Sequence, residues 1–137
     1  MSRLKRTYQL LIADDDPAFR ETLSEIFDPF FETIVADCGE HALEMVQDCP
    51  IDIALLDMHM RQLTGLETIR ALKLINRVAP CILITADYTR ELAANAAEAD
   101  AFSVLSKPVG RRDLVSTVSD AIGDAYDDPD IQARLHA

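Results

Sequence analysis

The sequence has few of the residues that a glycine-rich phosphate-binding loop requires. Its 137 residues include four glycines, which lie far apart: Gly39, Gly65, Gly110 and Gly123. Such a loop needs several closely spaced glycines so that backbone N–H groups can approach the phosphate. The glycine content therefore excludes this type of nucleotide site.

Cysteines are also scarce. Cys38, Cys49 and Cys81 are odd in number and show no paired spacing. A disulfide framework needs paired cysteines and an oxidising compartment. Because this chain lacks paired cysteines, we expect it to reside in a reducing compartment. Cys38, His41 and Cys49 resemble part of a zinc site, but a fourth ligand and the usual ligand spacing are missing, and zinc is not expected.

The sequence also has few basic residues and no long apolar run. The chain has 13 Lys and Arg against 24 Asp and Glu, a net charge of −11. This charge has the wrong sign for attracting a phosphate backbone, so direct nucleic-acid binding is not expected. The basic start, Met1–Arg6, is followed by the short apolar run Leu10–Ala13, which is insufficient for a signal peptide or a membrane span. We expect a cytoplasmic protein that does not contact membranes.

The chain has the length of one domain and carries five short apolar runs that alternate with amphipathic segments. The apolar runs predict strands buried on both faces, at Tyr8–Ala13, Thr33–Ala36, Ile51–Leu56, Cys81–Thr85 and Phe102–Leu105. The segments with helical spacing predict helices at Pro17–Phe27, Glu40–Gln47, Leu66–Asn76, Thr89–Ala99 and Asp113–Ala125. Asp16 is the expected N-cap of the first helix, because proline suits the position that follows a cap.

Strict alternation of strand and helix predicts an α/β fold with a parallel sheet covered by helices on both faces. Functional residues are then expected at the carboxyl ends of the strands. The C-terminal segment 126–137 is rich in aspartate, and we expect it to be a solvated acidic tail or the start of a linker, with one turn of helix at Ile131–His136.

Polar residues follow four of the predicted strands and would meet at one edge of the sheet: Asp14, Asp15, Asp57, Thr85 and Lys107. Neighbouring carboxylates repel by roughly 3–4 kcal/mol per pair at an effective dielectric near 20. A divalent cation with oxygen ligands, such as Mg²⁺, removes this repulsion. One carboxylate can act as a nucleophile, while a hydroxyl and an amine contact the oxygens of a phosphoryl group.

Four stretches in this order resemble the response regulator receiver domains of two-component signalling: Leu11–Pro17, Ala54–Met58, Ile84–Ala86 and Leu105–Pro108. The resemblance covers residues 6–125. It implies a CheY-like, flavodoxin-like doubly wound (βα)5 fold, with five parallel strands in the order 2-1-3-4-5 and helices on both faces.

The resemblance assigns a role to each residue at the edge. Asp57 would be the phosphoacceptor. Mg²⁺ would be bound directly by Asp15 and Asp57, largely through water by Asp14, and by the backbone carbonyl of His59.

The resemblance also implies that Thr85 hydrogen-bonds the phosphoryl group and that Lys107 pairs with it. The Lys107–Pro108 peptide is expected to be cis.

The chain departs from the family at three positions. Val104 stands where many receivers have an aromatic residue that changes rotamer on activation, and Phe102 is expected to face the same side and to fill part of that volume. Arg61 and Asp100 stand where the family often has proline and glycine, so the loops there are expected to differ in shape.

The resemblance implies a signalling domain that is not a turnover enzyme. It would accept a phosphoryl group from a sensor histidine kinase or a phosphotransfer protein, and would then bind a downstream effector protein or form a phosphorylation-dependent dimer. One alternative is an excised N-terminal receiver of a longer regulator with an output domain.

Two further alternatives are disfavoured by particular residues. An aspartate-nucleophile phosphatase needs a second aspartate where His59 stands. A phosphorylation-independent interaction module would be expected to lack an acidic ligand, the acceptor or the lysine.

Overall fold

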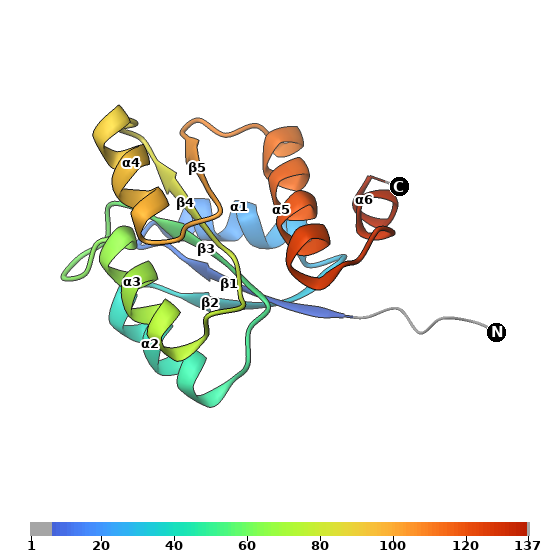
Figure 1. The fold of residues 1–137 in the computed structure, drawn as a ribbon, viewed down its shortest axis with the longest axis horizontal. Coiled ribbons are helices and arrows are strands. Elements are labelled where there is room, and N and C mark those ends of the chain that lie inside the picture. The colour runs from blue at the N-terminus through green and yellow to red at the C-terminus, as the bar shows by residue number, and fades with distance from the viewer. Residues whose placement is uncertain (1–6, 137) are drawn as a thin grey trace.

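The computed structural model describes residues 7–136, so Met1–Arg6, including the expected start of the domain at Arg6, lies outside the described residues. Strands and helices alternate along the chain (Figure 1). The strands are β1 (Tyr8–Ala13), β2 (Phe31–Ala36), β3 (Ile53–Asp57), β4 (Cys81–Thr85) and β5 (Ser103–Ser106). The helices are α1 (Pro17–Phe27), α2 (Gly39–Asp48), α3 (Gly65–Ile75), α4 (Arg90–Glu98), α5 (Arg111–Tyr126) and α6 (Ile131–Leu135).

The five strands form one parallel sheet in the order β2-β1-β3-β4-β5, which confirms the predicted fold class. The register aligns the carboxyl ends of the strands. Asp57 pairs with Ile84, and Thr85 pairs with Ser106. The polar residues that follow β1 and β5 and those that end β3 and β4 are therefore brought to one edge of the sheet.

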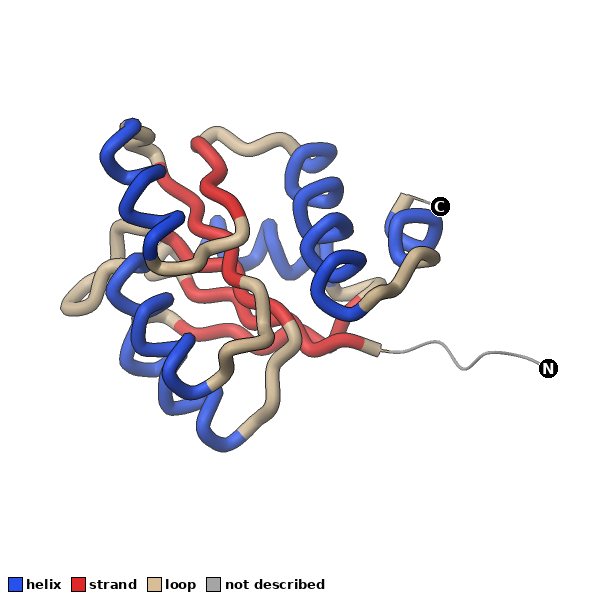
Figure 2. Tube along the Cα trace, viewed as in Figure 1, coloured by secondary structure: helices blue, strands red, loops and turns tan. Residues whose placement is uncertain are grey.

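Helices cover both faces of the sheet (Figures 1 and 2). Successive side chains of a strand point to opposite faces. In β1, Leu10 and Ile12 accordingly pack in the cluster formed with α1 and α5, whereas Leu11 and Ala13 pack in the cluster formed with α2, α3 and α4. The central strands β1, β3 and β4 are mostly apolar because both faces of the sheet are covered there.

The start of α1 confirms the predicted cap. The Asp16 side chain accepts a hydrogen bond from the Ala18 backbone N–H, and Pro17 occupies the first helical position. This short turn places Asp14 and Asp15 between the end of β1 and the beginning of α1.

The prediction that every strand is buried on both faces is wrong for β2 and β5. Both lie at edges of the sheet and are partly exposed; in β2, for example, Val35 is 43% exposed. An edge strand has a hydrogen-bonded neighbour on one side only, so its outer side chains receive less cover.

The prediction of a solvated C-terminal tail is wrong for α6. Ile131 and Leu135 are each 3% exposed and belong to the hydrophobic cluster of α1 and α5. The short apolar spacing of this segment is sufficient for one helical turn that covers the end of the core. Within residues 7–136, no helix combines the length and apolar character needed to cross a membrane.

Candidate functional site

Three carboxylates meet at the carboxyl edge of the central strands. Asp14 and Asp15 follow β1, Asp57 ends β3, and these two strands are neighbours in the sheet. One oxygen from each of the three carboxylates can be chosen so that all lie within 4.8 Å of one another. The structure thus brings together the acidic residues that the sequence predicts as metal ligands.

Asp14 is 1% exposed and incompletely satisfied. Its Oδ1 accepts a 2.8 Å hydrogen bond from the Asp16 backbone N–H, while its Oδ2 has no hydrogen-bond partner. Burial raises the pKa of Asp14, and the charge of Asp57 raises it further against the opposing effect of the Asp16 hydrogen bond. A cation at this position would relieve that unfavourable environment.

Lys107 is the cation that contacts this cluster. Its Nζ lies 2.9 Å from Asp57 Oδ1 and 3.5 Å from Asp14 Oδ2, and it also lies 4.2 Å from the ring centroid of Phe19. Burial acts to lower the pKa of Lys107, but the Asp57 hydrogen bond and the Asp14 charge outweigh it and raise that pKa. The ammonium group is therefore held in its charged form beside Asp57.

Thr85 lies fully buried at the end of β4. Its hydroxyl oxygen accepts a 3.0 Å hydrogen bond from the Asp87 backbone N–H, and its carbonyl accepts one of 2.7 Å from the Lys107 N–H. A hydroxyl that accepts this bond keeps its hydrogen available for donation. The Lys107–Pro108 peptide is cis, as expected.

The loop after Asp57 returns to the acceptor at Gly65. The Gly65 N–H donates to the Met58 carbonyl at 2.9 Å, and a Cβ at position 65 would lie 2.3 Å from the Asp57 carbonyl oxygen. Only glycine permits this approach. His59 lies in this loop and is exposed.

The departures from the family have distinct structural outcomes. Val104 lines a cavity of about 230 Å³. Phe102 borders this cavity but also lines the surface beside Asp124 of α5, and it does not fill the space next to Val104. Asp100 has a φ of 64°, the left-handed conformation that favours glycine, so an aspartate adopts the backbone shape that glycine usually provides.

Sequence reasoning did not single out three residues around the site. Phe19 lies under the Lys107 ammonium, and the Arg20 guanidinium donates a 2.7 Å hydrogen bond to the Asp14 carbonyl. Tyr88 lines the cavity beside Val104. The available signal for Phe19 and Arg20 was their place in the first turns of α1, directly after the three aspartates.

Comparison with known proteins identifies the family to which this chain is similar. A family profile described as "Response regulator receiver domain" matches residues 10–119. The transcriptional regulatory protein CpxR of Escherichia coli strain K12 is 33% identical over 111 residues, which cover 80% of this chain and 47% of CpxR. The transcriptional regulatory protein ZraR of the same strain is 27% identical over 118 residues, which cover 85% of this chain and 27% of ZraR. The chain thus spans less than half the length of these relatives.

Solved structures share the fold. A CheY-like receiver domain protein from Methanospirillum hungatei has a TM-score of 0.85 at 21% identity and covers 89% of this chain, with 98% of its own chain matched. The CheY of a CheX–CheY–BeF3–Mg complex from Borrelia burgdorferi has a TM-score of 0.79 at 26% identity, covering 82% of this chain and 87% of its own.

Proposed function

The chain belongs to the family of response regulator receiver domains, and from this premise we propose that Asp57 is its phosphoacceptor. The observation that carries the proposal is the 2.9 Å contact between Asp57 Oδ1 and Lys107 Nζ in a pocket where Asp57 is only 5% exposed. A lysine at this position can form an ion pair with an oxygen of the phosphoryl group once that group is attached to the carboxylate.

We further propose that Asp14, Asp15, Asp57 and the backbone carbonyl of His59 hold Mg²⁺. The donor set fits this ion, because it consists of oxygens and includes Oδ2 of Asp14, a buried oxygen that accepts no hydrogen bond. When bound, Mg²⁺ supplies positive charge that offsets the charge on the carboxylates and on the incoming phosphoryl oxygens.

The proposed transfer takes the phosphoryl group from a phosphohistidine of a sensor kinase or phosphotransfer protein. A carboxylate oxygen of Asp57 forms a bond to phosphorus while the phosphorus–nitrogen bond breaks, and the departing imidazole keeps the electron pair and takes up a proton. Lys107 pairs with one phosphoryl oxygen, and the Thr85 hydroxyl donates a hydrogen bond to another.

Thr85 provides a route from this reaction to the protein surface. The Thr85 hydroxyl oxygen accepts a hydrogen bond from the Asp87 N–H. This oxygen changes position if the hydroxyl turns toward a phosphoryl group on Asp57. The loop between β4 and α4, with Tyr88, would then adopt another conformation. We propose that this change favours binding of a downstream effector protein or formation of a phosphorylation-dependent dimer in the cytoplasm. In this role the domain is a signalling element and not a turnover enzyme.

Intact-mass measurement after incubation with acetyl phosphate and Mg²⁺ tests the proposal. We expect one added phosphoryl group in the wild type, none in Asp57→Asn, and none when EDTA removes the metal. Asp48→Asn, which changes an exposed aspartate on α2, is the matched control and should react like the wild type. An undiminished yield in Asp57→Asn would contradict the assignment.

A further inference from the structure

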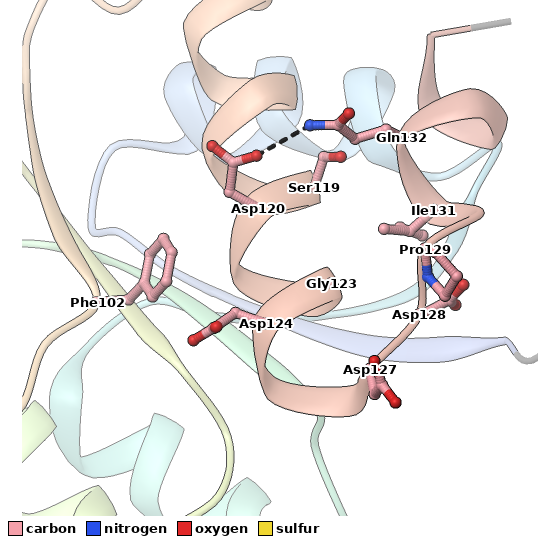
Figure 3. A pocket seen from close by; sticks show the side chains of 10 residues that line it. All are labelled: Phe102, Ser119, Asp120, Gly123, Asp124, Asp127, Asp128, Pro129, Ile131 and Gln132. Atoms are coloured by element: carbon pink, nitrogen blue, oxygen red, sulfur yellow. Dashed lines mark hydrogen bonds between the residues drawn. The ribbon is translucent and has the colours of Figure 1, made fainter.

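A groove of about 620 Å³ crosses the outer face of α5, between Phe102 and α6 (Figure 3). Gly123 forms part of its floor, and Ile131 and Gln132 of α6 lie along one side. Phe102 precedes β5, whereas Lys107 follows it, so the groove lies away from the edge that carries Asp57. The α6 side lies beyond residue 119, where the match to the family profile ends.

Carboxylates dominate the polar lining of this groove. Asp120 and Asp124 are spaced at i and i+4 on α5, and Asp127 is the left-handed residue that caps the end of this helix; all three line the groove. Asp120 accepts a 3.0 Å hydrogen bond from the Gln132 side chain, whereas Asp124 and Asp127 are exposed and have no ion-pair partner among residues 7–136. The groove therefore carries two exposed carboxylates that form no ion pair within the described part of the chain.

The groove also offers apolar surface and one unsatisfied polar atom. The Phe102 side chain is 39% exposed and lies beside Asp124 in Figure 3. Ser119 is fully buried, its Oγ has no hydrogen-bond partner, and Figure 3 shows its hydroxyl directed toward the α6 side of the groove. Unpaired buried hydroxyls are uncommon in folded proteins, and this one marks a position where a ligand atom could complete a hydrogen bond.

We propose that the groove binds a basic segment of a partner protein, one that carries two or more Lys or Arg residues together with an apolar side chain. The cations pair with Asp124 and Asp127, and the apolar side chain packs on Phe102. Charge complementarity selects this class of ligand, because the groove lining supplies carboxylates and the chain has a net charge of −11. The binding is separate from phosphorylation of Asp57 and goes beyond the proposed function.

The test uses the full, unphosphorylated chain and a fluorescent peptide of leucine and lysine, about 14 residues or four helical turns long. Fluorescence anisotropy should show saturable one-to-one binding. Asp124→Asn/Asp127→Asn should weaken binding about fivefold, as expected for the loss of two exposed ion pairs. The matched control is Glu21→Gln/Glu25→Gln, which removes the same charge from an exposed i, i+4 pair on α1 and should bind like the wild type.

Gly123→Met tests the groove itself rather than its charge. A Cβ at this position would make only ordinary contacts, 3.5 Å from the Asp128 carbonyl oxygen and 3.6 Å from Ile131 Cγ2, so the fold should persist, as circular dichroism would verify. The longer side chain should occupy the groove and abolish saturable binding. Backbone NMR shifts on titration should centre on Gly123 and Asp124.

Four outcomes would overturn the proposal. Equal weakening in the α1 control would mean unspecific attraction to an acidic protein, and full binding by Gly123→Met would place the peptide elsewhere. Self-association of the wild type that is lost in Asp124→Asn/Asp127→Asn would assign the groove to a second copy. Peptide binding seen only after Arg3, Lys5 and Arg6 are changed to serine would assign the groove to the chain's own basic segment.

Discussion

Asp14 and Asp128 are both shielded carboxylates near the sheet, but their surroundings differ. Asp14 has an oxygen without a hydrogen-bond partner and a raised pKa caused first by burial. Asp128 accepts hydrogen bonds from the Tyr8 hydroxyl at 2.7 Å and the Arg134 guanidinium at 2.9 Å. Burial acts to raise the pKa of Asp128 as well, but these two partners reverse the effect and lower it.

The two regions illustrate different roles for a carboxylate that is shielded from solvent. Asp128 fixes α6 to the first strand, and the neighbouring Tyr8 ring stacks on Tyr126 with centroids 5.4 Å apart. Its interactions are complete, so it stabilises the fold. Asp14 lies where carboxylates accumulate without full compensation, which costs stability and leaves the site ready to receive a cation.

The largest effect is expected from Gly65→Ala. The added Cβ would lie 2.3 Å from the Asp57 carbonyl oxygen and 2.7 Å from Leu83 Cδ1, and the backbone at the acceptor cannot give way cheaply. We expect the free energy of unfolding, measured in urea, to fall by about 3 kcal/mol. Phosphorylation of Asp57 should fall as well. A variant with unchanged stability would show that the acceptor edge tolerates more movement than its packing indicates.

Asp128→Asn should lower the free energy of unfolding by about 2 kcal/mol at pH 7, because it removes the charge partner of Arg134. The pKa of Asp128 is lowered in the folded state. Ionised Asp128 therefore stabilises the fold at pH values above its unfolded pKa near 3.8, and this stabilisation is lost as the pH falls through its folded pKa. The difference between variant and wild type should therefore shrink in acid. Asp127→Asn, a neighbouring exposed site, is the control and should change stability little at either pH.

Asp14→Asn should have the opposite sign. A raised folded pKa means that ionised Asp14 destabilises the fold, and that this cost appears as pH rises above the unfolded value of 3.8. Without metal at pH 7, we expect the variant to be about 1 kcal/mol more stable than the wild type in thermal or urea unfolding. Added Mg²⁺ should stabilise the wild type more than the variant. A metal-free variant that is less stable at pH 7 would contradict this account of Asp14.

Gly123→Ala should have the smallest effect and should stabilise the protein. Its Cβ would make ordinary contacts at 3.5 and 3.6 Å, and alanine is favoured over glycine in a helix by about 0.5–1 kcal/mol. Urea unfolding of Gly123→Ala and Gly65→Ala in parallel would compare a glycine that packing does not require with one that a close backbone approach does require. A marked loss of stability would show that the outer face of α5 is packed more tightly than these distances indicate.

The sequence predicted most of the fold because its signals are local. Asp16 before Pro17 defined the start of α1 correctly, and the apolar runs located all five strands to within a few residues. The strand ends then identified Asp14, Asp57, Thr85 and Lys107 as neighbours. The roles assigned to these residues remain predictions.

Sequence reasoning missed contacts between residues that lie far apart in the chain and belong to no common sequence motif. Tyr8 and Asp128 are 120 positions apart, and neither spacing nor composition connects them. The short apolar spacing of Ile131 and Leu135 was too brief to distinguish a packed helix from a solvated turn. The left-handed backbone at Asp100 could not be predicted either, because an aspartate in the sequence does not indicate that conformation; the turn in the folded structure imposes it.

The sequence by itself determined the order of strands and helices, the parallel sheet and the edge at which its polar residues gather, since hydrophobic periodicity and capping act over a few residues. Tertiary structure decided which charges are satisfied. Asp14 and Asp128 are the same residue type, yet burial without enough partners raises one pKa, and Tyr8 with Arg134 lowers the other. It also formed the acidic groove, because α5, α6 and Phe102 meet there only after the sheet and its helices have packed.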